Sequence, residues 1–300
     1  MAERLSFEGK VVVITGGGGA LGSAYAVEFA KRGAAVVVSD IGASMSGDGG
    51  SKSAADSVVE RIRQAGGKAV ADHHNVVDDG DKIIETAIRE YGRIDVLINN
   101  AGNLRDVSFR KMTPKDWASV LSVHLTGAFR VTQAAWKHME KQKYGRIVMT
   151  CSAAGLYGNF GQANYSSAKL ALMGLAQTLS LEGSRNNIKV NTIAPIANSR
   201  MLASVLPEEM LKEFQPSHIA ALVLCLCHDS CADSGATFEL GAGWYSKVRW
   251  ERSKGVLLVG ESVSCDQVHQ QWDEIGRFGS DSSHPTSTTD AYDAIAKARE

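Results

Sequence analysis

The first forty residues of the chain restrict its fold more than any other stretch. Residues 11–14 form a continuous β-branched run, which is typical of a buried strand, and the turn Thr-Gly-Gly-Gly-Gly-Ala-Leu-Gly follows at 15–22. Tyr25 and Phe29 then lie four residues apart, as on the inner face of a helix, before a second apolar run at 34–38. A strand, a glycine turn, a helix and a second strand in this order predict a βαβ unit of a parallel sheet.

The glycine turn and the acid after the second strand indicate what this unit binds. Glycines let the backbone approach a pyrophosphate, whose charge is stabilised at a helix N-terminus. Asp40 ends the second strand, where it can accept hydrogen bonds from the hydroxyls of an adenosine ribose and would repel a 2′-phosphate. The segment therefore predicts an NAD site rather than an NADP site, and the two flanking strands argue against the alternative of a flexible loop. The predicted contacts in the turn are Gly16, Gly18, Leu21 and Gly22.

Strand and helix patterns alternate along the rest of the chain. We expect further strands at 68–72, 94–98, 145–151, 188–193 and 237–240, the last being the final strand. We expect helices at 54–65, 81–91, 113–125, 127–142, 207–214 and 217–228, and a long helix that ends at about residue 185. This alternation predicts an α/β fold, a doubly wound parallel sheet of the Rossmann type with helices on both faces. Residues 1–245 are predicted to form a single domain and residues 246–300 a C-terminal extension that contains a linker-like stretch at 278–289.

Several small or polar residues follow the predicted strands directly. In an open parallel sheet, ligands bind outside the carboxyl ends of the strands. We therefore expect the cofactor to contact the residues that follow the third, fourth and sixth strands, which are Asn75, Val76, Asn100, Ala101, Gly102 and Pro195. His73 and His74 lie in a polar setting beside them and are expected to be exposed.

Composition excludes several classes of partner. The formal net charge is −1 and no long run of like charge occurs, which argues against nucleic acid or an anionic membrane as the main partner. The longest apolar runs are far shorter than a membrane span. Five cysteines, an odd number, indicate a reducing compartment, and the C-x-C-H-x-x-C spacing at 225–231 is not a usual zinc pattern. No signal peptide or S-K-L terminus is visible, so the residues alone suggest a cytoplasmic location.

Two residues at the start of the long helix predicted to end near residue 185 indicate acid–base chemistry. Tyr165 and Lys169 are four apart and share a helix face. An ammonium beside a phenol favours the phenolate, so we expect the pKa of Tyr165 to fall below its usual value near 10. Such a tyrosine can act as a general base, and Ser152, just after a predicted strand, could hydrogen-bond the same substrate oxygen. The alternative for this pair alone is a surface tyrosine beside a solvated lysine.

These marks together resemble a known family. T-G-x-x-x-A-x-G at 15–22, N-N-A-G at 99–102, Ser152, Tyr165-x-x-x-Lys169 and Pro195 occur in the order found in short-chain dehydrogenases/reductases, and the resemblance covers residues 5 to about 245. The dehydrogenase units of type 2 peroxisomal multifunctional enzymes are more similar still, to about residue 255 and more loosely to the end. That closer resemblance depends on the loop after Asp40 and on residues 141–147, 157–166, 241–244 and 249–252.

The resemblance implies a reaction and a set of roles. It implies oxidation of a (3R)-hydroxyacyl-CoA to a 3-ketoacyl-CoA with NAD in fatty-acid β-oxidation, by a peroxisomal homodimer, with hydroxysteroids as substrates of some members. Tyr165 would remove the hydroxyl proton, Lys169 would bind the nicotinamide ribose, and Ser152 would position the substrate oxygen. His124 stands where most of the family has the asparagine of a proton relay, so it is expected to help in that relay. Its alternative role is that of a packed helix histidine.

Two rival functions are compatible with the fold. A 3-oxoacyl-carrier-protein reductase would use NADPH, against which Asp40 argues. A non-catalytic dinucleotide sensor would need no general base, so the presence of Ser152, Tyr165 and Lys169 argues against it.

The segment 244–254 mixes aromatic and basic residues. Coenzyme A carries phosphates and an adenine, so its site requires Arg or Lys charge beside a flat apolar surface. Trp244 and Trp250 lie among four basic residues, Lys247, Arg249, Arg252 and Lys254. The segment is therefore a candidate coenzyme A site, and the alternative is a solvated basic face with the tryptophans packed against the protein.

Overall fold

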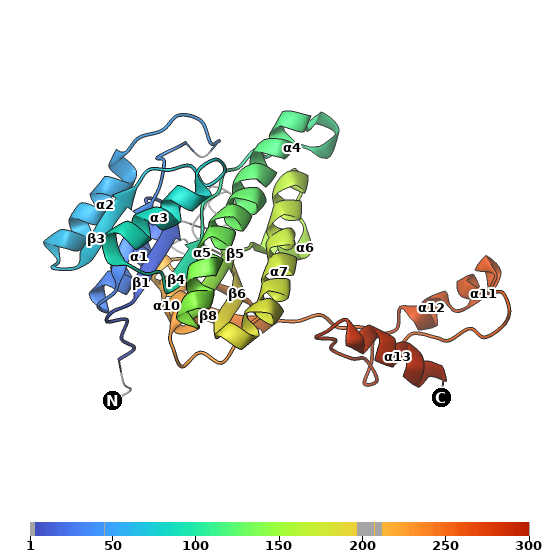
Figure 1. Ribbon diagram of the computed structural model, residues 1–300. Coiled ribbons are helices and arrows are strands. Elements are labelled where there is room, and N and C mark those ends of the chain that lie inside the picture. Colours follow the sequence, from blue (N-terminus) through green and yellow to red (C-terminus); the bar gives the residue numbers. More distant parts are fainter. Residues whose placement is uncertain (1–3, 45, 197–206, 208–211, 300) are drawn as a thin grey trace. The chain divides into compact units, whose positions relative to one another are not determined.

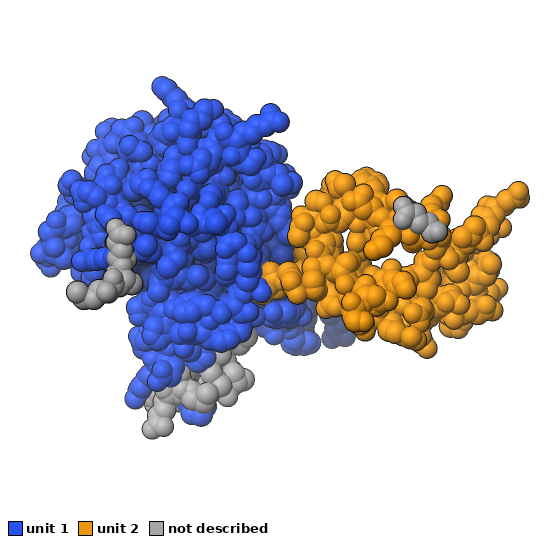
Figure 2. Space-filling model, turned by 90° about the horizontal axis from the view of Figure 1, so that it is seen from below, with its two compact units in different colours: residues 1–247 blue, residues 248–300 orange. Residues whose placement is uncertain are grey.

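The computed structural model describes residues 4–44, 46–196, 207 and 212–299. The chain divides into two compact units, Met1–Lys247 and Val248–Glu300, which Figure 2 shows in different colours. The division lies two residues beyond the boundary predicted from the sequence.

The first unit is built on one eight-stranded sheet with the order β3-β2-β1-β4-β5-β6-β7-β8 (Figure 1). Its strands are β1 (Val11–Thr15), β2 (Ala35–Ser39), β3 (Lys68–Asp72), β4 (Val96–Asn99), β5 (Gly145–Thr150), β6 (Ile188–Pro195), β7 (Thr237–Gly241) and β8 (Trp244–Val248). The pairings from β3 through to β7 are all parallel, which confirms the predicted doubly wound sheet. The chain runs outward from β1 to β3 and then from β4 to β8, so the order reverses between β1 and β4. Ligands bind at such a reversal point in open sheets.

The prediction that 237–240 is the final strand is wrong, because β8 follows it. Ala242 and Gly243 connect the two strands with φ values of 48° and 81°. A two-residue turn with positive φ at both positions joins antiparallel neighbours. The strand was missed because its mixed aromatic and basic residues lack a clear alternation, and because alanine rarely adopts positive φ.

Helices cover both faces of the sheet. The first unit contains α1 (Ala20–Lys31), α2 (Ser53–Gln64), α3 (Gly80–Tyr91), η1 (Phe109–Lys111), α4 (Pro114–Leu121), the π-helix η2 (Ser122–Gly127), α5 (Ala128–Gln142), α6 (Ala153–Tyr157), α7 (Ala163–Gly183), η3 (Ser184–Asn186) and α10 (Pro216–Cys227). Alternate strand residues point to opposite faces. Val12 and Ile14 therefore join a cluster with α1, α2 and α10, whereas Val11 and Val13 join another with α3, α5 and α7.

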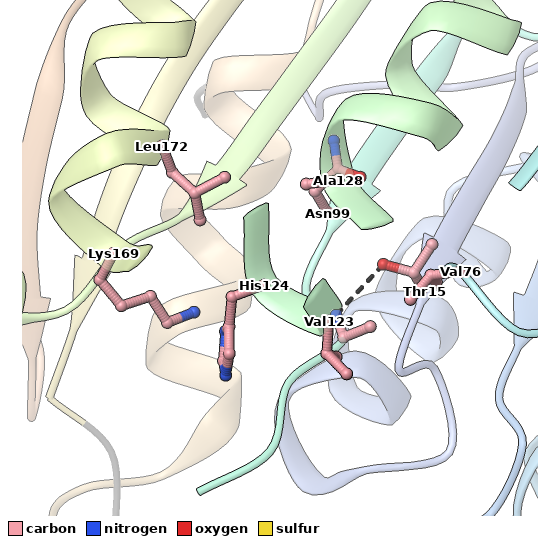
Figure 3. Close-up of a pocket in the computed structure, with 9 residues that line it drawn as sticks. Thr15, Val76, Asn99, Val123, His124, Ala128, Lys169 and Leu172 are labelled. Carbon is pink, nitrogen blue, oxygen red and sulfur yellow. Dashed lines mark hydrogen bonds between the residues drawn. The ribbon is translucent and has the colours of Figure 1, made fainter. Parts of the chain in front are cut away.

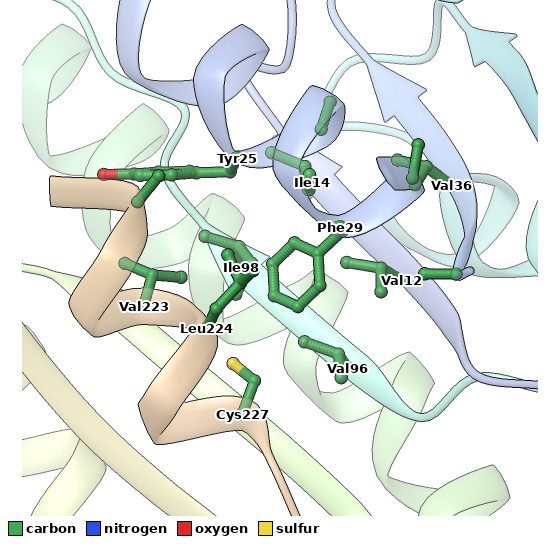
Figure 4. Close-up of a cluster of buried hydrophobic side chains, with 14 of the residues drawn as sticks. Val12, Ile14, Tyr25, Phe29, Val36, Val96, Ile98, Val223, Leu224 and Cys227 are labelled. Atoms are coloured by element: carbon green, nitrogen blue, oxygen red, sulfur yellow. The ribbon is translucent and has the colours of Figure 1, made fainter. Parts of the chain in front are cut away.

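The packing of α1 places the glycine turn. Tyr25 and Phe29 are 0% exposed and lie between β1 and α10 (Figure 4). Burial of the Phe29 side chain contributes about 1.5–3 kcal/mol to the free energy of unfolding. Gly22 permits this packing, since a Cβ atom at that position would lie 2.2 Å from the carbonyl oxygen of Gly16. The N-terminus of α1 is thereby held against the end of β1.

The predicted start of the helix at 113 is confirmed by a capping box. The Thr113 hydroxyl accepts a hydrogen bond from the backbone N–H of Asp116, and the Asp116 carboxylate accepts one from the N–H of Thr113. The π-helix η2 then interrupts the predicted helical run. Half of the helix predicted at 207–214, residues 208–211, lies outside the described residues. Among the helices that are described, none has the length and apolar character needed to cross a membrane.

The prediction that His73 and His74 are exposed is wrong, because both are partly buried and have acidic partners. His73 Nε2 lies 3.1 Å from the carboxylate of Asp56, and His74 Nδ1 lies 2.9 Å from that of Asp72. On α10, Cys227 is buried and Cys225 is exposed. Within the described ranges, no three His, Cys, Asp or Glu side chains gather in a group that could hold a metal ion.

The second unit contains three short helices, α11 (Cys265–Gln270), α12 (Trp272–Ile275) and α13 (Thr289–Arg299). Arg252 and Ser283 exchange two backbone hydrogen bonds of 2.8 Å, which join its start to the stretch predicted as a linker. No residue described from 248 to 299 is buried. This unit therefore lacks the apolar core that stabilises the first.

Candidate active site

The glycine turn after β1 lies so close to neighbouring residues that larger side chains in it would clash with them. A Cβ atom on Gly16, whose φ is 64°, would lie 2.9 Å from Cα of Ala101, and one on Gly18 would lie 2.7 Å from Cβ of Ala54. Asp40 accepts hydrogen bonds from the N–H groups of Gly18 (2.9 Å) and Gly42 (2.7 Å). A carboxylate has about four acceptor positions, so about two remain for ribose hydroxyls. The turn and Asp40 therefore fit a dinucleotide.

Asn100 and Thr15 hold this turn in place. The Asn100 amide nitrogen donates to the carbonyl oxygens of Thr15 and Gly16, both at 3.1 Å. The Thr15 hydroxyl accepts from the N–H groups of Asn100 and Ala101, also at 3.1 Å. The side chain of Asn100 thus supports the turn instead of remaining free for the cofactor. Thr15 was not among the predicted site residues, although its place at the end of β1 could have indicated this role.

The other predicted cofactor residues lie at the carboxyl ends of neighbouring strands. Leu21 is in the first turn of α1, Pro195 ends β6, and Val76 is buried after β3. The side-chain oxygen of Asn75 accepts from the N–H of Val77 at 2.9 Å. Asn75 therefore has its amide N–H groups and one acceptor position of its oxygen left for an adenine.

His124 lies in the π-helix and is 4% exposed. Gly102 allows its close approach, since a Cβ atom there would lie 2.4 Å from Cε1 of the ring. His124 Nε2 lies 3.1 Å from the backbone nitrogen of Asn103 and 2.8 Å from its carbonyl oxygen. Burial, together with the charge of Lys169, lowers the pKa of His124 to about 3, so the ring is neutral. It holds the backbone of Asn103, a residue that the sequence did not single out.

Ser152, Tyr165 and Lys169 come together beside His124. Ser152 caps α6 and accepts from the N–H of Ala154 at 3.2 Å, and its side chain hydrogen-bonds Tyr165 in the first turn of α7. The rings of Tyr165 and His124 meet edge to face, with centroids 5.2 Å apart. Lys169 Nζ lies 5.4 Å from the centroid of the tyrosine ring. All the residues predicted to be catalytic therefore share one site.

The predicted fall in the pKa of Tyr165 is wrong in this structure. Burial raises the pKa of Tyr165 to about 12 and outweighs the hydrogen bond with Ser152, which lowers it. Burial also lowers the pKa of Lys169 to about 8. The Lys169 ammonium donates to the carbonyl oxygen of Thr150 at 2.6 Å. Desolvation of both groups therefore dominates the attraction expected from their spacing.

A small cavity lies between these groups (Figure 3). Its volume is about 10 Å³, and Asn99, His124 and Lys169 are its polar lining residues together with Thr15. Lys169 points toward the ring of His124. Asn99 Oδ1 and His124 Nδ1 are buried and have no hydrogen-bond partner within the described part of the chain. The volume is close to the roughly 10–15 Å³ that one water molecule requires.

The basic side chains of the candidate coenzyme A segment have protein partners in most cases. Lys247 pairs with Asp233, and Lys254 lies 3.6 Å from the carboxylate of Asp281. Arg252 donates to the carbonyl oxygen of Asp290 at 3.0 Å. These contacts favour a structural role for the segment, and coenzyme A binding there stays a prediction.

Comparison with known proteins places the chain in a family. The sequence model of the short chain dehydrogenase family matches residues 10–209. The peroxisomal hydratase-dehydrogenase-epimerase of Saccharomyces cerevisiae is 51% identical over 305 residues, covering 100% of this chain and 34% of the yeast protein. The structure of full-length peroxisomal multifunctional enzyme type 2 from Drosophila melanogaster is 42% identical with a TM-score of 0.84, over 98% of this chain and 50% of that one.

The chain thus spans a third to a half of the length of these relatives. A 7α-hydroxysteroid dehydrogenase solved with NADH and 7-oxo glycochenodeoxycholic acid is 31% identical with a TM-score of 0.71, over 81% of this chain and 98% of that one. Motif order, sheet topology and site geometry agree with these matches. The chain therefore belongs to the short-chain dehydrogenase family.

Proposed function

We propose that this chain is an NAD-dependent (3R)-hydroxyacyl-CoA dehydrogenase of peroxisomal fatty-acid β-oxidation. The observation that carries the proposal is the arrangement of Ser152, Tyr165 and Lys169 in one site, within a chain that resembles peroxisomal multifunctional enzymes over nearly its full length. The names of those relatives include a dehydrogenase and a peroxisomal location. Hydroxysteroids are a second substrate class, which the likeness to a hydroxysteroid dehydrogenase supports.

The roles of the residues follow from their positions. Ser152 holds the substrate hydroxyl beside Tyr165, and the phenolate form of Tyr165 accepts its proton as a general base. With a pKa of about 12, Tyr165 must first lose its own proton to reach this form. The oxidised nicotinamide, when bound, accepts hydride and brings a positive charge to the site. Ser152 then hydrogen-bonds the ketone oxygen. Lys169 supports the charge on Tyr165, and its pKa of about 8 lies close to neutral pH, so it can exchange protons there.

His124 is proposed to assist this proton exchange as a neutral group. Lys169 points toward its ring, and the cavity between them has room for about one water molecule (Figure 3). With a pKa of about 3, the ring does not hold a second proton at neutral pH. The neutral ring of His124 can therefore pass on a proton only if one ring nitrogen releases a proton while the other ring nitrogen accepts one.

NAD is proposed as the preferred cofactor because Asp40 faces the ribose position. An unpaired carboxylate beside a phosphate dianion should weaken NADP binding by roughly 2 kcal/mol or more relative to NAD. Asp40→Ala should narrow this gap. Asp40→Asn removes the charge but keeps a single oxygen, which can accept from only one of the N–H groups of Gly18 and Gly42. Equal wild-type turnover with both cofactors would contradict the assignment.

A homodimer is proposed from the outer face of α7. Leu170, Gly174 and Leu181 are exposed along this helix, and a Cβ atom on Gly174 would meet nothing within 4 Å. Positions three and four apart lie on one face, so these residues form an open apolar stripe. Sedimentation should give twice the chain mass of 32.0 kDa, and Leu181→Glu should shift the species toward monomer.

The function is tested by incubating the chain with NAD and a (3R)-hydroxyacyl-CoA and following NADH absorbance. The (3S) enantiomer and a hydroxysteroid serve as comparison substrates. Turnover of the (3R) thioester supports the proposal. Tight NAD binding without NADH formation from any hydroxyacyl-CoA would refute it and favour a dinucleotide sensor.

A further inference from the structure

The loop between β2 and α2 is an ordered feature at the carboxyl edge of the sheet. Its described residues are 41–44 and 46–52, and we refer to them as the β2–α2 loop. At its base, the Ser51 N–H donates to the carbonyl oxygen of Ile41 at 2.9 Å. At its tip, Ser44 N–H donates to Asp48 O and Gly47 N–H donates to Ser44 O, both at 2.9 Å. These bonds give the loop a defined shape despite its glycine and serine content.

The tip of this loop meets the segment that follows β4. Arg105 donates to the Asp48 carboxylate at 3.2 Å, and the two side chains are 22% and 71% exposed. Gly47 has a φ of 83°, and a Cβ atom there would lie 2.9 Å from Nδ2 of the Asn103 side chain. Only glycine therefore permits this approach without strain.

The sheet order shows what the loop crosses. β1 lies between β2 and β4, and the glycine turn follows β1 directly. A loop that leaves β2 and reaches residues after β4 must pass over the carboxyl end of β1 (Figure 1). A dinucleotide held by the glycine turn would consequently lie beneath it.

The residues that receive the loop are anchored to the active site. Arg105 Nε donates to the Ser119 hydroxyl of α4 at 3.1 Å, and the Asn103 amide donates to the same hydroxyl at 3.2 Å. His124 holds the backbone of Asn103 and contacts the ring of Tyr165. Arg105 and Asn103, which receive the loop, are therefore anchored to the active site, whereas Asp48 is exposed.

We propose that the β2–α2 loop is a clasp over the bound dinucleotide, and that the Asp48–Arg105 ion pair is the latch that slows cofactor release. Arg105 and Asp48 are positioning residues in this proposal. It rests on dinucleotide binding and is independent of the acyl-CoA substrate. Exposed ion pairs are weak, so we expect the latch to change the release rate by no more than about fivefold. Salt should weaken the latch, because it screens exposed charges.

The test measures NADH release without any acyl substrate. The protein is loaded with NADH, mixed rapidly with excess NAD, and followed by NADH fluorescence. Asp48→Ala should release NADH about three- to fivefold faster than wild type, and Arg105→Ala somewhat faster still because it also loses Ser119. Wild-type release should accelerate toward the variant rates at about 1 M salt. Exchanging the charges, Asp48→Arg with Arg105→Asp, should restore most of the slow release.

Two further variants complete the design. Arg110→Ala removes an exposed arginine five positions along the chain and should leave the release rate unchanged. Gly47→Ala keeps both charges but strains the tip against Asn103, so it should also speed release. Release rates that are the same in wild type, Asp48→Ala and Gly47→Ala would overturn the clasp. A protein that shows the latch effect but oxidises no hydroxyacyl-CoA would refute only the proposed substrate.

Discussion

The amino-terminal ends of the parallel strands form one edge of the sheet, the amino edge, and their carboxyl-terminal ends form the other, the carboxyl edge. Both edges contain buried polar groups, but the hydrogen bonds of these groups differ. At the amino edge, Asp95 is 0% exposed and accepts hydrogen bonds from the N–H of Val11 (2.9 Å) and from Arg93 (2.6 and 2.8 Å). Asp229, which is exposed, accepts from Lys10 at 3.0 Å and from the Tyr144 hydroxyl at 2.5 Å. These acidic groups are therefore paired within the protein.

At the carboxyl edge, several buried polar atoms are left without such partners. Side-chain atoms of Asn99, Asn103, His124 and Thr150 find no hydrogen-bond partner among the residues that the structure describes. Lys169 is buried with a carbonyl group and no acid as its hydrogen-bond acceptor. The contrast is not absolute, because Arg146 Nε at the amino edge also lacks a partner within the described ranges. Unsatisfied buried groups gather where a ligand binds, whereas paired groups stabilise the fold.

The largest expected effect is the loss of catalysis on changing Tyr165 to phenylalanine at the carboxyl edge. Turnover should fall by about 10²–10⁴-fold, because the proton acceptor is lost, while NAD binding stays nearly intact. Tyr144→Phe at the amino edge is the matched control, since it loses the bond to Asp229 and should keep its activity. If Tyr165→Phe kept more than about a tenth of wild-type turnover, the general-base assignment would be wrong.

At the carboxyl edge, Lys169→Met should lower the turnover of the protein and raise its stability. Turnover should fall about 100-fold or more, since the proton-exchanging group is lost. The pKa of Lys169 is lowered from 10.5 to about 8 on folding, so the folded chain binds fewer protons between pH 8 and 10.5. Wild-type stability should therefore rise with pH across this window, and below it the burial of the charge costs at most roughly 3 kcal/mol.

Lys169→Met lacks the cost of burying the lysine charge, so it should melt at a higher temperature than wild type at pH 7. Its advantage should shrink as the pH rises from 8 to 10.5. Thermal melts at several pH values measure the difference. A variant that is less stable than wild type at pH 7 would show that the lysine stabilises the fold.

Asp95→Ala should produce the opposite pattern at the amino edge. The free energy of unfolding should fall by about 2–3 kcal/mol, because the N–H of Val11 loses its acceptor and Arg93 loses its partner. Turnover of the folded fraction should stay within about twofold of wild type, since such distant sites act independently. Denaturant titration and steady-state rates measure the two quantities. An activity loss without a stability loss would contradict the division between the edges.

The smallest effect concerns the segment 244–254, which begins in β8 and continues beyond it. Arg249→Ala with Arg252→Ala should raise KM for a hydroxyacyl-CoA about two- to fivefold if these charges contact the nucleotide, because exposed charges contribute about 0.2–1 kcal/mol each. A small hydroxyacyl thioester without the nucleotide is the control and should be unaffected. Equal effects on both substrates would assign the segment a structural role, in agreement with the contact between Arg252 and Asp290.

Much of the fold and the site could be predicted from the residues alone. Buried strands read as continuous apolar runs, and parallel strands bring their carboxyl ends to one edge. Residues that follow different strands in the sequence, such as Gly16, Asp40 and Ser152, were therefore expected to meet, and they lie along that edge. A helix spacing of four likewise placed Tyr165 beside Lys169.

Local patterns were insufficient wherever the answer depended on distant parts of the chain. The spacing of Tyr165 and Lys169 indicated proximity, but the pKa of each depends on burial by elements remote in sequence and on the Thr150 carbonyl of β5. The contact between Asp48 and Arg105 joins residues 57 positions apart and leaves no periodic signal. Desolvation and long-range pairing arise only when the whole chain is packed. The local sequence patterns that predicted the sheet therefore could not predict them.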